Sequence, residues 1–211
     1  MNFGMTRGQR LHLERQELNI VEKFKYLGST ISQEGDLDCE IGHRVNAAWM
    51  NWKRMSGVLC DRKMNMNMKG KIYRTVIRPA MIYGLETWLV KKGQEKRLEV
   101  AEMRMLRWSC GVTRMDRIRN EIIRGKIKVT EISKKMQERR LQWYGHVERR
   151  GENYVGKKVA RIEVEGKRAR GRPKKRWKNW VNEDLCEKQL SGNEVHNRTE
   201  WKRLTRNTDP V

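Results

Sequence analysis

The sequence is poor in the residues that build a large, dry core. Its 211 residues include only two Phe, and the 37% that are hydrophobic barely exceed the 35% that are charged. This composition can bury one modest core or two small ones, which argues against a large catalytic core. Cysteine is scarce too: Cys39, Cys60, Cys110 and Cys186 stand singly, without a CxxC pair. They do not form a secreted disulfide framework, and we expect reduced thiols inside the cell.

Long apolar runs are also missing. The best apolar window, residues 80–90, is interrupted by Glu86 and is shorter than the roughly 18 residues of a membrane-spanning helix. Residues 1–7 lack the apolar centre of a signal peptide. We therefore expect no secretion and no membrane partner, and a nuclear or cytoplasmic location.

Acidic residues are too few to balance the basic ones. There are 26 Asp and Glu against 48 Lys and Arg, which gives a net charge of +22 and a pI near 10.3. Residues 1–60 carry a net +1, so residues 61–211 carry +21. This balance predicts a polyanionic partner for the later part of the chain and a packing role for the first part.

Alternation of apolar and polar side chains predicts strands at the start of the chain. A hairpin is indicated by Leu11 and Leu13, then Leu18 and Ile20, on either side of a polar stretch. One further strand is expected over residues 24–31.

From Asp38 onward the apolar period becomes helical. Asp38 is the expected N-cap of a first helix. A second helical pattern covers residues 68–89, with a kink or break at Pro79. A third helix is expected over residues 94–110, ended by Gly111. The first helix is predicted from apolar residues at steps of three and four: Ile41, Val45, Ala48, Trp52, Met55 and Leu59.

Two more helices and a strand are expected before the most basic part of the chain. A short helix is predicted over residues 115–124. Another begins at the capping candidate Thr130 and extends to Val147. Alternation over residues 160–164 predicts a short edge strand.

The densest charge lies in residues 154–178, with 11 basic and 2 acidic side chains. Pro173 is suited to the first turn of a helix, whose apolar stripe includes Trp177, Val181 and Leu185. A short, weakly amphipathic stretch follows over residues 194–205, and the last few residues are expected to fray.

Several runs, in this order and spacing, resemble the C-terminal part of non-LTR (LINE-type) retrotransposon reverse transcriptases. The likeness covers roughly residues 19–185. The runs are Phe24 to Ser29, Ile77 to Trp88, Met105 to Trp108, Asp116 to Asn120, Arg140 to Val147, Gly171 to Trp177, and Asp184 with Leu185.

This resemblance implies the last palm strands, the thumb and a basic C-terminal region. The expected fold is α+β and mostly α: a short N-terminal β segment, a thumb-like helical bundle and a basic helical C-terminal module. The corresponding ranges are residues 1–36, 37–111, a helical connector at 112–153, and 154–211.

The catalytic part of such a polymerase is absent. A reverse transcriptase needs a carboxylate cluster to hold two Mg²⁺ ions, whereas this sequence has no Asp-Asp pair. Asp36 and Asp38 are interpreted as turn and capping residues. We expect no catalytic residues, no cofactor and no polymerase activity of the chain's own.

Metal binding is not expected either. Long gaps separate the first three of the available ligand residues, and the set lacks the close pairs of zinc sites. They are Cys110, His146, Cys186 and His196.

Contacts with nucleic acid are expected from the primer-grip-like turn and from two helices. The resemblance implies that Tyr26, Leu27 and Gly28 face nucleic acid; the alternative is a half-buried packing strand. Cations on the thumb-like helices would neutralise phosphates without sequence readout, and a solvated helical face is the alternative. These candidates are Arg44, Lys53 and Arg54 on the first helix, and Lys69, Lys71 and Arg74 on the second.

The basic run before the predicted helix at Trp177 has two functional interpretations. It resembles an AT-hook, whose arginines lie in a narrow A·T minor groove. The other interpretation is a generic basic linker, which binds RNA or DNA by charge or serves as a nuclear-localisation patch, and the non-functional alternative is a helix entry with Pro173 in its first turn. Its candidate contact residues are Arg168, Arg170, Gly171, Arg172, Pro173, Lys174, Lys175 and Arg176.

The expected partners are RNA, DNA or an RNA–DNA hybrid, with an intact reverse transcriptase or its ribonucleoprotein as a further candidate. An AT-hook DNA binder and a Mg²⁺-dependent nuclease remain alternative functions. A chain that folds poorly without the missing palm is a third alternative. The aromatic residues among the basic ones are expected in the core, with Trp180 the candidate for base stacking. They are Trp143, Tyr144, Trp177, Trp180 and Trp201.

Overall fold

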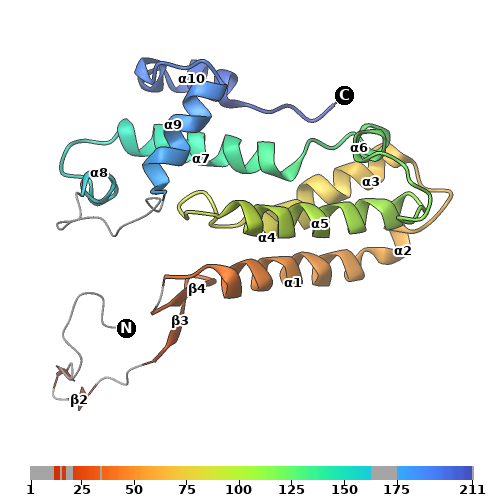
Figure 1. Ribbon diagram of the computed structural model, residues 1–211, viewed down its shortest axis with the longest axis horizontal. Helices are drawn as coiled ribbons and strands as arrows, with labels where there is room; N and C mark the ends of the chain where they lie inside the picture. The colour runs from red at the N-terminus through yellow and green to blue at the C-terminus, as the bar shows by residue number, and fades with distance from the viewer. Residues whose placement is uncertain (1–11, 15, 18–20, 34, 163–174, 211) are drawn as a thin grey trace.

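The computed structural model describes residues 12–14, 16–17, 21–33, 35–162 and 175–210. The fold is α+β and mostly α, as the sequence predicts. Short antiparallel hairpins come first and are followed by helices stacked in successive layers (Figure 1). No helix in these ranges combines the length and the apolar character needed to cross a bilayer.

The first hairpin lies in the predicted part of the chain, but its second strand is formed by residues of the polar stretch that was expected to be the turn. Strand β1 (His12–Leu13) pairs with β2 (Gln16–Glu17) in antiparallel register. Three of the apolar residues that suggested it, Leu11, Leu18 and Ile20, lie outside the described residues.

The second hairpin corrects the single strand predicted over residues 24–31. Strand β3 (Lys23–Tyr26) pairs with β4 (Ser29–Ser32). Leu27 and Gly28 have φ values of 48° and 84° and reverse the chain between them. Two consecutive residues with positive φ form the tight turn that matches the twist of paired strands.

The first predicted helix is confirmed as α1 (Asp38–Arg54), and the short α2 (Ser56–Leu59) continues its apolar stripe. Asp38 is not the N-cap, because Leu37 occupies that position. The Asp38 carboxylate instead accepts hydrogen bonds from the side chains of Gln94 and Arg97. A partner on a distant helix therefore replaces the local capping bond.

The second predicted helix is interrupted and shorter than expected. Helix α3 (Met66–Ile72) passes into the π-helical turn η1 (Tyr73–Ile77) and then into α4 (Arg78–Ile82). Pro79 stands in the first turn of α4, directly after the π-helical turn, so the regular α-helical hydrogen-bond pattern is interrupted next to the residue that has no N–H to donate. The predicted continuation to residue 89 is wrong, because residues 83–88 form turns and bends.

The third predicted helix is confirmed as α5 (Lys92–Ser109), and the chain leaves it through Gly111 at a φ of 67°. The next helix begins later than predicted. It is α6 (Asn120–Ile127), because Asp116 accepts hydrogen bonds from both the backbone N–H and the hydroxyl of Thr113 and holds that segment in a turn.

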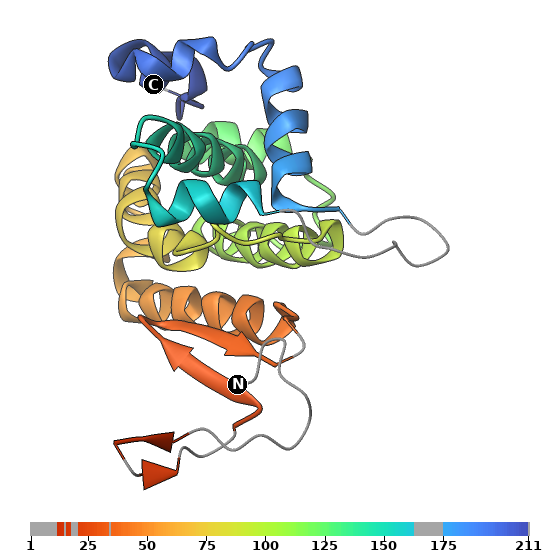
Figure 2. The ribbon, with the colours of Figure 1, turned by 90° about the vertical axis from the view of Figure 1, so that its left-hand side faces the viewer.

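Two hydrophobic cores are present in the described part of the chain, in line with the composition. Helix α1 packs on α4 and α5, and α5 packs on α6 and on α7 (Ile132–Glu148) (Figure 2). The larger core lies between these helices and includes fully buried side chains from each of them: Ile41, Ile77, Met81, Leu98, Met105, Leu106, Ile127 and Ile132.

Helix α7 (Ile132–Glu148) contributes to both cores. It is covered by α9 (Trp177–Glu187), the 3₁₀ turn η2 (Asn193–His196) and α10 (Arg198–Thr205). Helix α9 matches the apolar stripe of the predicted helix, but it begins at Trp177 with Arg176 as its N-cap, so the prediction that Pro173 stands in its first turn is wrong. The smaller core is formed by Leu141, Val181, Val195 and Trp201.

The segment between α7 and α9 corrects another prediction. Val155–Arg161 forms the helix α8, so the strand expected over residues 160–164 is wrong for its described part. Lys157 of α8 is buried, and its Nζ donates to the carbonyl oxygens of Glu148 and Arg150. These bonds use carbonyl groups at the end of α7 and hold α8 against it.

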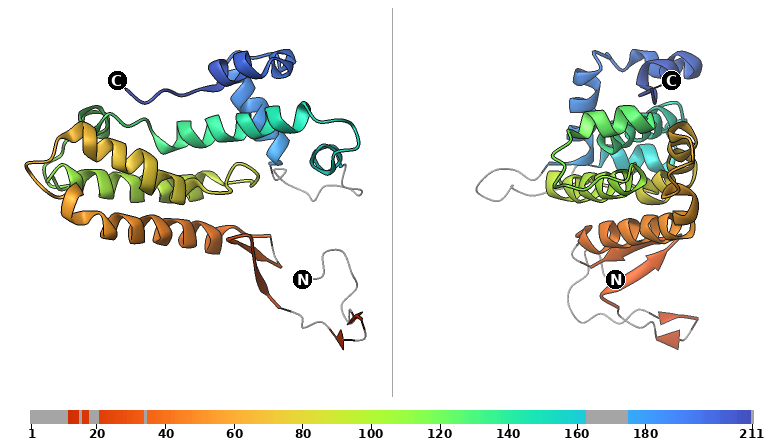
Figure 3. Two further views of the ribbon diagram at one scale, coloured as in Figure 1. Left: turned by 180° about the vertical axis from the view of Figure 1, so that it is seen from behind. Right: turned by 90° about the vertical axis from the view of Figure 1, so that its right-hand side faces the viewer.

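The end of the chain does not fray as predicted. After α10 it runs back along α7 (Figures 1 and 3). Asp209 forms a bidentate ion pair with Arg78, at 2.7 and 2.8 Å. Thr130 donates its N–H to Asp209 and its hydroxyl to Thr208, so it does not cap α7, and Glu131 occupies the N-cap position.

Candidate nucleic-acid interface

The buried carboxylates are already paired with arginines inside the protein. Glu40 pairs with Arg44 at 2.6 Å, Glu102 with Arg124 at 3.1 Å, and Asp184 with Arg140 at 2.6 Å. A buried charge without a partner would cost several kcal/mol, at least ~3 by mutational measurements, which explains the pairing. Each pair is neutral, so the surplus of +22 resides on the remaining side chains.

Arg44 lies inside the protein rather than on an exposed face. Besides Glu40, its guanidinium donates to the carbonyl of Gly28 and to the hydroxyl of Ser29, and it lies 4.7 Å from the ring centre of Tyr83. These bonds attach the β3–β4 turn to α1. Arg44 is therefore removed from the set of phosphate-contacting candidates.

Lys69 and Arg74 are also committed within the fold. Lys69 is 2% exposed, and its Nζ donates to the carbonyl of Ser109 at 2.8 Å. Arg74 is half-buried and donates to the carbonyl of Lys128. The helical period placed these cations near the apolar stripe but did not show that their ends reach carbonyl groups of other elements. Both leave the candidate set.

Lys53, Arg54 and Lys71 remain exposed. The first two lie in the last turn of α1 and the third lies near the end of α3. Within the described ranges, none of the three has a carboxylate within ion-pair distance. Lys53 and Arg54, near the C-terminus of α1, are also favoured by the helix dipole, so their exposure does not require an anion.

The predicted primer-grip-like turn projects from the body of the protein. Tyr26 and Leu27 are 56% and 75% exposed. Tyr26 stacks with Phe24 at 6.4 Å between ring centres, and Tyr83 donates its hydroxyl proton to the carbonyl of Leu27 at 3.2 Å. The interpretation of these side chains as half-buried packing residues is wrong, because Phe24, Tyr26 and Leu27 are all exposed.

The basic run is described only in part. Arg168, Arg170, Gly171, Arg172, Pro173 and Lys174 lie outside the described residues. Lys175 pairs with Glu183, and Arg176 is the N-cap residue of α9. The candidate for base stacking, Trp180, already has cations over its ring: Arg140 at 5.2 Å and Lys175 at 4.8 Å from its centre.

An aromatic cluster on α1 and α5 was not predicted. Trp49 and Trp52 of α1 meet Trp108 of α5 with ring centres 5.3 to 5.6 Å apart, and Trp108 is 56% exposed. Beside it a groove of about 450 Å³ is lined by Lys96, Arg97 and Arg104, among others. The signal in the sequence was the spacing of Trp49 and Trp52, three residues apart on one helix face.

Cations beside this groove are largely compensated. Lys96 pairs with Glu99 at 3.0 Å, and Arg97 with Asp38 at 3.3 Å. Arg104, the third cation of the lining, is exposed and forms no ion pair within the described ranges. The groove is therefore less cationic than its residue types suggest.

The potential metal ligands are not gathered. Among the described residues, no group of three or more His, Cys, Asp or Glu side chains is arranged to hold a metal ion. Cys39, Cys60, Cys110 and Cys186 are free thiols, and burial raises the pKa of Cys110.

The chain is similar to a protein derived from a transposon. It is 25% identical over 198 residues to an uncharacterized transposon-derived protein of Caenorhabditis elegans, and the alignment covers 90% of this chain and 68% of that protein. No family model matches the sequence. No solved structure matches it. The similarity thus relates this chain to a transposable element.

Proposed function

We propose that this chain binds RNA, DNA or an RNA–DNA hybrid mainly through phosphate contacts, and that it has no polymerase site of its own. Its ancestry in this proposal is the C-terminal part of a non-LTR retrotransposon reverse transcriptase. The similarity to a transposon-derived protein supports an origin in a mobile element. The ordered sequence runs, from the turn at Gly28 to the helix at Trp177, support the finer assignment.

The observation that carries the proposal is the location of the charge. The buried carboxylates form ion pairs with internal arginines, so they do not offset the charge of exposed cations. A surplus of +22 on the rest of the molecule repels itself unless a polyanion approaches. A nucleic-acid backbone offers such charge at regular spacing and releases condensed counterions when it is bound.

Fluorescence anisotropy with labelled duplex DNA, RNA–DNA hybrid and single-stranded RNA tests the proposal. We expect binding at low salt and an affinity that falls about 10³-fold or more between about 50 and 200 mM salt, if six or more phosphates are contacted. An affinity that does not change with salt, or no binding at low salt, would overturn the proposal. Extension of a primer in the presence of Mg²⁺ would overturn the absence of a polymerase site.

Paired charge variants test which cations contact phosphate. Replacing Lys53, Arg54 and Lys71 together by Gln removes three exposed and unpaired charges. We expect the slope of log affinity against log salt to become shallower by up to about 0.9 for each duplex phosphate that the variant no longer neutralises.

The matched control removes three exposed charges that already have carboxylate partners. Lys96 pairs with Glu99, Arg97 with Asp38, and Arg161 with Glu152. Replacing Lys96, Arg97 and Arg161 by Gln changes the net charge equally, so a general charge effect would alter both triple variants alike. A larger slope change for the unpaired set supports local phosphate contacts.

A further inference from the structure

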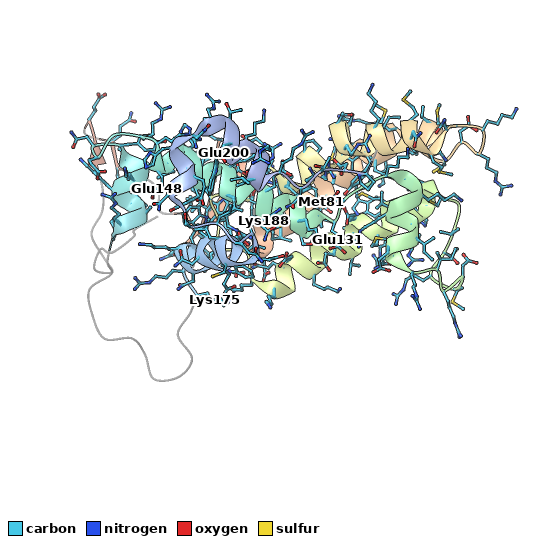
Figure 4. The ribbon with its side chains drawn as sticks, turned by 90° about the horizontal axis from the view of Figure 1, so that it is seen from above. Met81, Glu131, Glu148, Lys175, Lys188 and Glu200 are labelled. Atoms are coloured by element: carbon cyan, nitrogen blue, oxygen red, sulfur yellow. The ribbon has the colours of Figure 1, made fainter. Side chains whose placement is uncertain are left out.

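A cavity of about 650 Å³ between α7 and α10 concentrates positive charge. Four of its lining residues are Lys or Arg, and none is Asp or Glu. Glu148 of α7 and Glu200 of α10 lie near the end of the molecule that holds this cavity (Figure 4), but neither residue belongs to the cavity lining. The lining consists of Gln142, His146, Arg149, Arg150, Arg198, Trp201 and Lys202.

The lining residues come from α7, from the two positions that follow it, and from α10. Gln142 and His146 share one face of α7, Arg149 and Arg150 directly follow its last residue, Glu148, and positions 198, 201 and 202 share one face of α10. Arg198 and Lys202 are like charges four residues apart, an arrangement that disfavours a helix. The fold thus places mutually repelling cations from both helices around one space.

Packing gives the cavity a defined wall. Trp201 is 1% exposed, and its Nε1 donates to the carbonyl of Leu141 at 3.0 Å. The indole crosses α7 at Gly145, where a Cβ atom would lie 2.3 Å from Nε1. Arg149 is held in place because its Nη1 donates to the carbonyl of Val195 at 2.8 Å.

The cations around this cavity lack compensating carboxylates. Over the described ranges, Arg149, Arg150, Arg198 and Lys202 form no ion pair. Burial and the nearby Arg198 lower the pKa of Arg149. The cavity therefore differs from the buried sites, where each arginine has its own carboxylate.

His146 completes the wall as a neutral group near pH 7. Burial, followed by the charges of Arg150, Arg149 and Arg198, lowers its pKa below the ordinary 6.5. Its ring stacks on Trp143 at 5.4 Å between ring centres and meets the edge of Tyr154 at 6.0 Å. These contacts fix the imidazole at the cavity.

We propose that this cavity binds a phosphate group of nucleic acid, with the exposed Arg198 and Lys202 as the principal ligands and the charge of Arg149 beside them. Arginine forks and lysine ammonium groups match the oxygens of a phosphate, and charge-assisted hydrogen bonds of this kind are strong. The inference rests on the proposed function, since it takes the phosphate from a nucleic acid. Both a terminal phosphate and an internal phosphodiester present this chemistry.

The test compares a short single-stranded oligonucleotide with a 5′-phosphate against the same strand with a 5′-hydroxyl, by fluorescence anisotropy at low salt. The cavity variant is Arg198→Gln with Lys202→Gln. The matched control is Lys134→Gln with Arg139→Gln, which removes two exposed charges from α7 outside the cavity. Thermal melting of both variants checks that they fold.

We expect the cavity variant to bind the oligonucleotide at least about tenfold more weakly than the control variant does. Each charge-assisted hydrogen bond to phosphate that is removed lowers the affinity by about this factor or more. If the weakening is confined to the 5′-phosphorylated strand, the cavity holds a chain end. If both strands bind more weakly by the same factor, it holds an internal phosphate. Equal affinities of the cavity and control variants would overturn the cavity site while leaving the proposed function intact. Absence of binding by the unmodified chain at low salt would overturn the proposed function itself.

Discussion

Asp209 fastens the end of the chain to α4 and to the start of α7, and its replacement by Asn tests that attachment. The Asp209 carboxylate accepts two hydrogen bonds from Arg78 and one from the backbone N–H of Thr130. The side chains of Arg78 and Asp209 are only 8% and 17% exposed. Asp209→Asn keeps the shape of the group but leaves the guanidinium of Arg78 without its counter-charge.

The expected destabilisation follows from the pKa of Asp209. Burial opposes its ionisation, but the bonds from Arg78 and Thr130 outweigh burial and lower the pKa from 3.8 to about 2. This difference corresponds to about 2 kcal/mol of stability at neutral pH. Complete removal of one partner of a buried ion pair costs about 3–5 kcal/mol. We expect about 2 kcal/mol, since Asn retains one acceptor oxygen, and a Tm lowered by about 4–8 °C.

The dependence on pH has a definite sign. Because the pKa of Asp209 is lower in the folded protein than in the unfolded chain, its contribution is fully present above the unfolded value of 3.8. It is lost as the pH falls through the folded value of about 2. The stability difference between the parent protein and Asp209→Asn should therefore be constant from neutral pH to about 5, and narrow below 4.

Urea denaturation followed by circular dichroism at several pH values measures this difference. Glu121→Gln serves as the control, because Glu121 is exposed on α6. Coinciding urea midpoints for the parent and Asp209→Asn at neutral pH would refute the reasoning. So would a difference that stays constant down to pH 2, because the carboxylate would then not be its source.

Three further predictions concern single positions. Gly145→Ala should destabilise the protein by about 1–3 kcal/mol, because its Cβ would lie 2.3 Å from the buried indole nitrogen of Trp201. Gly125→Ala should stabilise the protein slightly, because Gly125 faces open space on α6. Urea denaturation measures both changes. Leu27 has a φ of 48°, a conformation that strains leucine by about 1 kcal/mol and that asparagine adopts more easily. Leu27→Asn should therefore increase the protection of the β3 and β4 amides against hydrogen exchange. Unchanged protection would contradict this prediction. Arg44→Gln should lower the free energy of unfolding by about 3–5 kcal/mol, because it leaves the buried carboxylate of Glu40 unpaired. The control Lys53→Gln should change this free energy by less than about 0.5 kcal/mol. Equal changes for the two variants would show that Arg44 is not an internal residue.

Periodicity located the helices that must bury one face. The stripes of α1, α5 and α9 were predicted because a helix on the surface of a core repeats its apolar residues every three to four positions. The secondary-structure predictions that failed concern segments whose conformation depends on a few backbone angles or on contacts with residues far away in the sequence. The turn at Leu27 is an example, since a leucine with positive φ carries no turn signal. The π-helical turn before Pro79 is another.

The sequence predicted that the candidate site is a cationic surface, but it identified only some of the residues that are exposed there. Composition indicated a cationic surface, and Lys53, Arg54 and Lys71 are exposed as cations of that surface must be. Arg44 and Lys69 belong to the same helices and residue types, yet they are buried. Whether a long cationic side chain reaches solvent or a carbonyl group depends on which element packs against its helix.

The amino-acid sequence by itself determined the charge surplus and the helical character of most of the chain, because both follow from residue type and short-range spacing. Only the tertiary structure decided which charges are neutralised inside and which remain free. Arg78 and Asp209 are 131 positions apart, and the cations of the α7–α10 cavity come from the end of α7 and from α10, which are separated by α8 and α9. Electrostatic pairing depends on distance in space, and that distance is set by how the helices pack.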